Sequence, residues 1–264
     1  MMPGDLFMER RIRSLVRPIL QALSHVSAQT DADATRFMAL GVAADRCTVT
    51  GNLKFDAPHP DNLTSEATAL RQHFGPEPIW MAASTHPGEE DIILQAHQVV
   101  LSQQPKAKLL LVPRHPNRFD TVAALCRSKT LATKRFSTNE AIDNKTQVVV
   151  GDVVGKMMWF YSAVDVVFMG GSLMPIGGHN FIEPASVGKA CITGPHLHNF
   201  AKVAAMLTDA GALMQVKDAE TLAAAVLSQL TNAADTEQQG LRAKGVADKN
   251  RGACQRQLAI ILNA

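Results

Sequence analysis

The sequence has few cysteines and few aromatic residues, and the cysteines form no recognisable site. Its four cysteines are far apart and make no CxxC pair; they are Cys47, Cys126, Cys191 and Cys254. This spacing argues against a zinc ribbon, a redox motif and a disulfide framework, and is typical of a protein in a reducing cytoplasm. We therefore expect no metal and no cofactor.

The sequence also lacks a strong excess of either charge and any long apolar run. Its 26 basic and 24 acidic residues give a net charge of +2, which is not the footprint of a nucleic-acid-binding protein. No stretch reaches about 18 uncharged apolar residues, and the first 20 residues lack a signal-peptide core. We predict no membrane span and no export. The basic residues 10–17 favour a solvated helix face, with contact to an anionic membrane surface as the alternative.

Several catalytic motifs are absent from the chain. It contains no HExxH, GxSxG or Walker loop, and no GxGxxG follows the first strand expected in the main domain. These absences argue against a metalloprotease, a serine hydrolase, a P-loop NTPase and an ordinary dinucleotide dehydrogenase.

From about Ile79 onward, short apolar runs alternate with helical stretches. The predicted strands are IWMAAS, KLLLVP, QVVVGD, VDVVFMGG and ACITGP, and helices are expected over 88–104, 116–128, 155–162, from 180, and over 200–210. Uninterrupted apolar strands separated by helices are typical of a parallel sheet that is covered on both faces. The pattern predicts a doubly wound, Rossmann-like α/β domain with ligand loops at the carboxyl ends of its strands.

Polar loops follow each of these five strands. They contain Ser84, Thr85 and His86; Arg114 and His115; Gly151 and Asp152; residues 170–180; and Gly194 to His196. Because the carboxyl ends of parallel strands share one edge of the sheet, the loops should converge there. This convergence favours a ligand site over five independent turns.

The most informative loop is bracketed by two glycine pairs, Gly170-Gly171 and Gly177-Gly178. A strand, a glycine-rich turn and a helix start in this order can direct backbone N–H groups at an anionic ligand. Glu183, on the first helical turn after Asn180, is placed to bind ligand hydroxyls. The alternative is a tight turn in which Asn180 caps a helix and Glu183 faces the positive end of its dipole.

Four other residues have a binding and a structural interpretation. Arg114, between two prolines, offers a planar fork to a phosphate or carboxylate, or it caps a strand end at the surface. Lys156 adds a charge beside Gly155, or it is a solvated helix residue. His86 and His179 are candidates for acid–base chemistry, but a lone loop histidine more often orders its loop by hydrogen bonding.

The composition divides the chain into four parts. Residues 1–56 are predicted to be the remnant of another α/β domain, because about 50 residues are too few for a core of their own. Residues 57–75 are predicted to form a linker and a connecting helix over Leu63 to Phe74, and residues 76–232 a Rossmann-like domain. Residues 233–264 form a helical segment that packs back across the domain boundary.

Seven ordered motifs resemble the 3-deoxy-D-manno-octulosonic acid (Kdo) transferases. They are SAQTDADATRF, VTGNLKFD, ASTHPGEE, VPRHPNRF, VVVGD, GGSLMPIGGHNFIEPA and GPHLHNF, which together extend from Ser27 to Phe200. The resemblance implies the two-domain GT-B architecture and transfer of Kdo from CMP-Kdo to a lipid A precursor in lipopolysaccharide synthesis. It implies that residues 1–56 are a remnant of the acceptor domain and that residues 76–232 are the domain that binds the donor, CMP-Kdo. It further implies peripheral association with the cytoplasmic face of the inner membrane of a Gram-negative bacterium.

The resemblance also implies which residues contact CMP-Kdo. These are Pro113 and Arg114; Val154, Gly155 and Lys156; and Asn180, Phe181, Ile182 and Glu183. Further candidates are Ser84, Thr85, His86, Gly177, Gly178 and His179.

Two departures from the family pattern affect these expectations. Lys156 stands where the family has glutamate, so an acceptor for ribose hydroxyls is replaced by a positive charge. The chain also lacks most of the family's amino-terminal domain, which carries the general base, so no catalytic residue is assigned and the chain alone is expected to turn over weakly or not at all. Two other functions stay open: a non-catalytic nucleotide-binding module, and a UDP-sugar epimerase of similar architecture.

Overall fold

The computed structural model describes residues 15–263, which form two compact units. One unit consists of residues 59–247, and the other combines the chain up to Pro58 with the segment from Asp248. The basic residues Arg10, Arg11 and Arg13 lie outside the described part. Within that part, no helix is both long and apolar enough to cross a membrane.

The unit of residues 59–247 is built on a seven-stranded, fully parallel sheet in the order β5-β6-β4-β3-β7-β8-β9. The chain starts in the middle at β3, builds outward through β4 to the β6 and β5 edge, and then returns to the other side of β3 with β7. The strands are β3 (Ile79–Thr85), β4 (Lys108–Pro113), β5 (Thr133–Arg135), β6 (Val148–Val150), β7 (Val166–Met169), β8 (Cys191–Thr193) and β9 (Leu213–Gln215).

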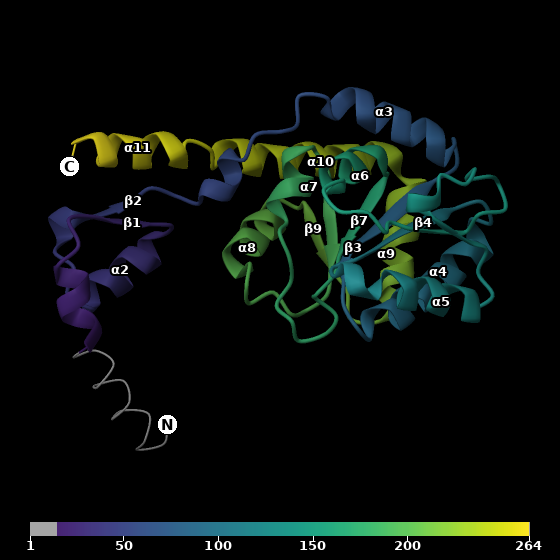
Figure 1. The fold of residues 1–264 in the computed structure, drawn as a ribbon, viewed down its shortest axis with the longest axis horizontal. Coiled ribbons are helices and arrows are strands. Elements are labelled where there is room, and N and C mark those ends of the chain that lie inside the picture. The colour runs from purple at the N-terminus through teal and green to yellow at the C-terminus, as the bar shows by residue number, and fades with distance from the viewer. Residues whose placement is uncertain (1–14, 264) are drawn as a thin grey trace, which may run out of the picture. The chain divides into compact units, whose positions relative to one another are not determined.

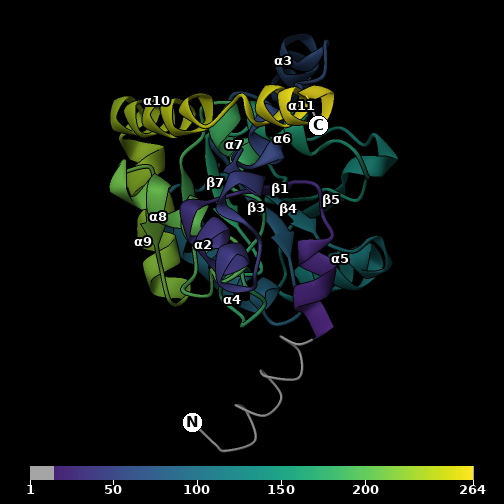
Figure 2. The ribbon, with the colours of Figure 1, turned by 90° about the vertical axis from the view of Figure 1, so that its left-hand side faces the viewer.

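Helices cover both faces of this sheet (Figures 1 and 2). Figure 1 shows α4 and α5 on one side and α6 and α7 on the other, with α3 beyond α6. The helices are α3 (Leu63–Phe74), α4 (Glu89–Gln103), α5 (Phe119–Ser128), α6 (Met157–Ala163), α7 (Ile182–Ser186), α8 (Ala201–Asp209), α9 (Ala219–Thr231) and α10 (Ala233–Lys249). Short 3-10 turns follow β4 and β5 at Pro116–Arg118 and Phe136–Thr138.

The core explains why the strands are continuous apolar runs. Trp80, Leu109 and Phe168, from three neighbouring strands, are fully buried in a cluster with residues of α4, α5 and α9. Side chains that alternate with these face the other side of the sheet and are equally buried, so both faces exclude water. The predicted doubly wound α/β fold is thereby confirmed.

Two polar pairs are built into this core. The Trp80 Nε1–H group donates a hydrogen bond to Nδ1 of buried His97 at 3.1 Å, and His97 Nε2 lies 2.9 Å from the Gln147 carbonyl oxygen. At the amino end of β4, the ammonium group of buried Lys108 lies 2.7 Å from the Glu77 carboxylate. His97 and Lys108 thus both have hydrogen-bond partners, as the burial of polar groups requires.

The other unit contains a two-stranded parallel sheet of β1 (Val26–Ala28) and β2 (Cys47–Val49). It also contains α2 (Asp31–Ala39), the 3-10 turns Ala44–Arg46 and Leu53–Asp56, and α11 (Ala253–Asn263). The Asp56 carboxylate accepts hydrogen bonds from the amides of Gly252 and Cys254, both at 2.6 Å, and so caps the start of α11. Arg256 on α11 donates to the Thr50 carbonyl at 2.8 Å, which ties the helix to the segment after β2.

The sequence predictions differ from the structure mainly at element ends and sheet edges. The helix expected from Asn180 is only the five residues of α7, and the one expected over 155–162 begins at Met157. The edge strands β5 and β9 were not predicted, because TKR and LMQ are short and not fully buried.

Candidate functional site

The site lies where the strand order reverses, between β3 and its two neighbours β4 and β7. This position is where open α/β sheets bind ligands. The end of β3 is distorted there: the β3–β4 register shifts between Ala83 and Thr85, and Ser84 has a φ of 56°. Such a strained backbone in a non-glycine residue is typical of functional sites.

A glycine is required where β7 passes this distortion. A Cβ on Gly170 would lie 2.7 Å from the Ser84 carbonyl oxygen and 2.9 Å from that of Ala83. Because both neighbours are backbone atoms, they cannot move aside as a side chain can.

The backbone amides after β7 converge on an anion, and this anion is the carboxylate of Glu89 in the same chain. Glu89 at the start of α4 is completely buried, and its carboxylate accepts hydrogen bonds from the amides of Gly171, Ser172 and Leu173 at 2.7 to 2.9 Å. The same carboxylate accepts from the His86 amide at 2.9 Å. These amides are therefore not open to a ligand, which corrects that part of the sequence prediction.

Glu90, the next residue, is also buried and holds the loop after β4. Its carboxylate accepts two hydrogen bonds from the Arg118 guanidinium, at 2.6 and 3.2 Å, and one from the Thr85 hydroxyl at 2.8 Å. Helix capping alone does not account for Glu89 and Glu90, because each carboxylate reaches beyond its own helix to another loop.

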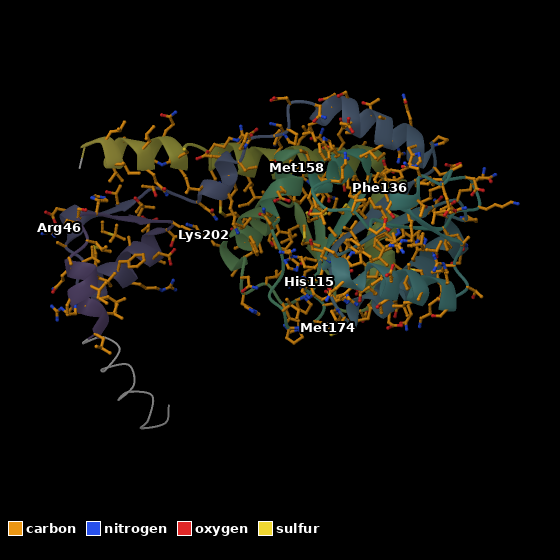
Figure 3. The ribbon with its side chains drawn as sticks, viewed as in Figure 1. Arg46, His115, Phe136, Met158, Met174 and Lys202 are labelled. Atoms are coloured by element: carbon orange, nitrogen blue, oxygen red, sulfur yellow. The ribbon has the colours of Figure 1, made fainter. Side chains whose placement is uncertain are left out.

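Three histidines from three loops meet at this edge. The Nε2 atoms of His86 and His179 are 2.7 Å apart and their rings are stacked, while the His115 ring packs edge-on against His86 at 5.6 Å. Figure 3 shows His115 and Met174 at the same end of this unit. The predicted convergence of the loops after β3, β4 and β7 is therefore observed.

The histidine pair is held in a neutral state at neutral pH. Burial lowers the pKa of His179 to about 4, helped by the repulsion that a protonated His86 would exert and by the positive charge of Arg114. Burial also lowers the pKa of His86. One Nε2–H group therefore donates to the other Nε2 atom, and the pair acts by hydrogen bonding rather than by charge.

Arg114 is exposed beside these histidines, whereas the neighbouring Pro113 is buried. The Arg114 amide donates to the Thr85 carbonyl at 3.0 Å, which fixes the backbone from which its side chain leaves. No ion pair within residues 15–263 involves its guanidinium. The side chain is thus available for an anionic ligand.

The second glycine pair links two loops. Gly178 donates to the Gly171 carbonyl at 2.7 Å, and the Asn199 amide donates to the Gly177 carbonyl at 3.0 Å. A Cβ on Gly177 would collide with the side chains of Asn199 and His198. Gly177 and Gly178, with φ values of 109° and 78°, therefore let the loop after β7 pack on the loop after β8.

The segment from Asn180 to Glu183 leads into α7. Asn180 accepts a hydrogen bond from the Ile182 amide at 3.1 Å and donates to the Glu183 carboxylate at 3.0 Å. Asn180 and Glu183 are half-buried, whereas Phe181 and Ile182 are buried. Only the first two present side-chain polar atoms to a ligand, and any contact by Phe181 or Ile182 involves the backbone.

The loop after β6 is anchored at one end and open at the other. Asp152 is buried and accepts hydrogen bonds from Arg135 Nε and from the amide of Ser137. Two residues later Val154 is 78% exposed, and a Cβ on Gly155 would meet no atom within 4 Å. The loop therefore has room for a ligand.

The Lys156 side chain contacts α3 and the first turn of α6. Its ammonium group lies 4.1 Å from the centre of the Trp159 ring and 4.0 Å from the Glu66 carboxylate on α3. No hydrogen bond or ion pair joins it to Arg114 or Glu183 in the described part of the chain. The segment 154–156 is therefore placed beside the other candidate residues only by the position of β6 next to β4 in the sheet.

Sequence reasoning missed three supports of the site, Glu89, Glu90 and Arg118, and it expected Asp152 in a ligand loop rather than as a support. Acidic residues are common in the first turn of a helix, so the positions of Glu89 and Glu90 alone do not indicate a further role. The amides that bind Glu89 lie 82 to 84 residues further along the chain, and no sequence signal connects them to it.

Two cavities lie away from this edge. One of about 580 Å³ is lined by residues of α3, the carboxyl ends of α6 and α7, and α10, including Thr68, Ser162 and Ser186. Another of about 370 Å³ lies near Asp165 and Lys189, at the amino ends of the strands. We place the candidate site at the opposite edge, where the loops and the strained backbone converge. Within residues 15–263, no group of His, Cys, Asp and Glu is arranged to hold a metal.

The fold of the chain is of the GT-B type. The chain is similar to HepE from Anabaena, with a TM-score of 0.56 over 99% of this chain and 68% of that one, although only 18% of residues are identical. It is also similar to the carboxy-terminal CMP-Kdo binding domain of WaaA from Acinetobacter baumannii. That match has a TM-score of 0.66 and 34% identity, and covers 70% of this chain and 97% of that domain.

Sequence comparison identifies the family. Residues 5–57 match the family model described as 3-deoxy-D-manno-octulosonic-acid transferase (kdotransferase). The chain is 37% identical to the transferase of Haemophilus influenzae, over 95% of this chain and 59% of that protein, and 35% identical to that of Bordetella pertussis, over 92% and 57%. The chain belongs to the Kdo transferase family. It spans somewhat less than three fifths of the length of these two relatives.

Proposed function

We propose that this chain is the donor-binding part of a Kdo transferase and that the edge formed by the loops after β3, β4, β6 and β7 binds CMP-Kdo. The observation that supports this most strongly is the 34% identity to the WaaA domain, of which the chain covers 97% and whose described ligand is CMP-Kdo. The exposed guanidinium of Arg114 at the strand-order switch fits a phosphate ligand.

In this proposal each segment has a distinct role. Arg114 binds the phosphate of CMP, with Pro113 fixing the backbone before it. Asn180 and Glu183 bind hydroxyl groups, with backbone contacts from Phe181 and Ile182, and Val154, Gly155 and Lys156 form a second contact along the nucleotide. Ser84, Thr85, His86, Gly177, Gly178 and His179 shape the site between them.

The reaction of the whole enzyme would then be attack of a sugar hydroxyl of a lipid A precursor on the anomeric carbon of CMP-Kdo. The bond from this carbon to the CMP phosphate oxygen breaks, and the phosphate leaves with the electron pair. Arg114 stabilises the negative charge of the departing CMP. We assign no general base among residues 15–263, and we propose that the enzyme acts peripherally at the cytoplasmic face of the inner membrane.

Titration of the purified chain with CMP and with UMP tests donor recognition. Binding of CMP in preference to UMP is expected, whereas preference for UMP favours the epimerase-like alternative. An assay of Kdo transfer from CMP-Kdo to a lipid A precursor tests catalysis by the chain alone. We expect at most weak turnover. Robust turnover would contradict the proposal that this chain is only the donor-binding part of the enzyme. Binding of neither nucleotide would refute the donor site.

A further inference from the structure

Glu89 connects two of the loops that form the proposed donor site. Its two carboxylate oxygens accept four backbone hydrogen bonds, one from the loop after β3 and three from the loop after β7. A carboxylate with its lone pairs used in this way, and with no exposed surface, cannot touch a ligand. Its effect on a ligand must pass through the loops that it holds.

A chain of hydrogen bonds leads from this carboxylate toward the proposed donor residues. Glu89 binds the Gly171 amide, and the Gly171 carbonyl accepts from Gly178 at 2.7 Å, two residues before Asn180. In parallel, Glu89 binds the Ser172 amide, and the Ser172 carbonyl accepts from His196 at 3.0 Å. The position of Asn180 and Glu183 thus depends on where Glu89 places Gly171 and Ser172.

We propose that Glu89 is a positioning residue for the donor site: it acts as a built-in anion that folds the loop after β7 into its binding conformation before the donor arrives. This inference rests on the proposed function. In the absence of this anion, three amides that point inward would have to find water or a ligand oxygen. With it, the loop does not need to be ordered on binding, so the ordering cost is not subtracted from donor affinity.

Glu89→Gln is the direct test, because glutamine has nearly the same volume but replaces one acceptor oxygen with an NH2 donor. At least one pair of amides then faces a donor instead of an acceptor. Glu77→Gln is the matched control: it removes the charged partner of buried Lys108 at the amino end of β4, away from the proposed site. Both variants should lower the melting temperature, which separates loss of stability from loss of binding.

Calorimetric titration with CMP gives the first readout. We expect Glu89→Gln to weaken CMP binding at least tenfold and Glu77→Gln to leave it within twofold of wild type. A folded Glu89→Gln chain that binds CMP within twofold of wild type would overturn the proposal. If the wild-type chain binds no CMP, the proposed function fails and the second readout decides the inference about Glu89.

Amide hydrogen exchange of the wild-type chain gives that second readout and does not depend on any variant folding. We expect Gly171, Ser172 and Leu173 to be protected without nucleotide, to the level of the core strands. Exchange as fast as that of exposed Val154, with protection appearing only when CMP is added, would show that the ligand rather than Glu89 orders the loop.

Discussion

Replacing Arg114 with methionine should remove phosphate recognition while leaving the fold intact. The side chain is exposed and forms no ion pair within the described residues, so its truncation leaves no buried charge without a partner. Its backbone amide, which donates to the Thr85 carbonyl, is retained. The melting temperature should therefore be unchanged.

The expected loss of affinity follows from the kind of contact. A hydrogen bond between a guanidinium and a phosphate contributes about 1.5 to 3 kcal/mol, which corresponds to a roughly 10- to 150-fold weaker binding of CMP. Cytidine has no phosphate, so its affinity should be the same for wild type and for the variant. Comparing both ligands on both proteins isolates the interaction between Arg114 and the phosphate.

Calorimetry with CMP and cytidine measures all four affinities. Arg127→Met is a suitable control, because Arg127 is an exposed arginine on α5. Equal binding of CMP by Arg114→Met and wild type would refute the assigned role. An equal loss of CMP and cytidine binding would show that Arg114 supports the site in some way other than phosphate recognition.

Three further predictions concern the framework of the donor-binding unit. Burial lowers the pKa of His97 to about 4, so an unfolded chain binds a proton at this residue from pH about 6.5 downward while the folded chain does not. Denaturant unfolding should show stability declining between pH 6.5 and 4, by about 3 kcal/mol from His97, and His97→Gln should have a shallower slope; an unchanged slope would contradict this. Asp152→Asn should lose about 2 kcal/mol of unfolding free energy at pH 7, because Arg135 and Ser137 lose a buried charged acceptor. Those bonds outweigh burial and lower the pKa of Asp152, so the wild-type advantage should shrink as the pH falls below about 4. Gly170→Ala should cost about 3 kcal/mol or prevent folding, because its Cβ meets backbone oxygens, whereas Gly245→Ala, with open space and a helical backbone, should be neutral or stabilising; equal melting temperatures would be inconsistent with this packing.

Much of the fold could be predicted from the sequence because the central strands are continuous apolar runs. The strand KLLLVP and the helix over Leu63 to Phe74 have the predicted bounds. The edge strands β5 and β9 could not be predicted, because each has three residues and gains its pairing only from a neighbour that is distant in sequence. Short helices such as α7 are set by tertiary packing rather than by local propensity.

The convergence of the loops was predictable from the sequence, but the residues that support these loops were not. The loops after β3, β4 and β7 were expected to converge, and the contacts of His86 with His115 and His179 show that they do. The sequence could not reveal that the amides after β7 are already bound by Glu89, since a buried carboxylate and an exposed helix-capping one look alike in a motif. The roles of individual donor-binding residues stay predictions.

The central claim, that the donor binds at the loops after β4, β6 and β7, is tested most directly by mapping CMP on the chain by NMR. The account predicts that amide signals of Arg114, Gly155 and Glu183 shift on addition of CMP, while those of Thr68, Ser162 and Ser186 in the 580 Å³ cavity do not. Shifts confined to the cavity residues, with none at Arg114, Gly155 and Glu183, would contradict it.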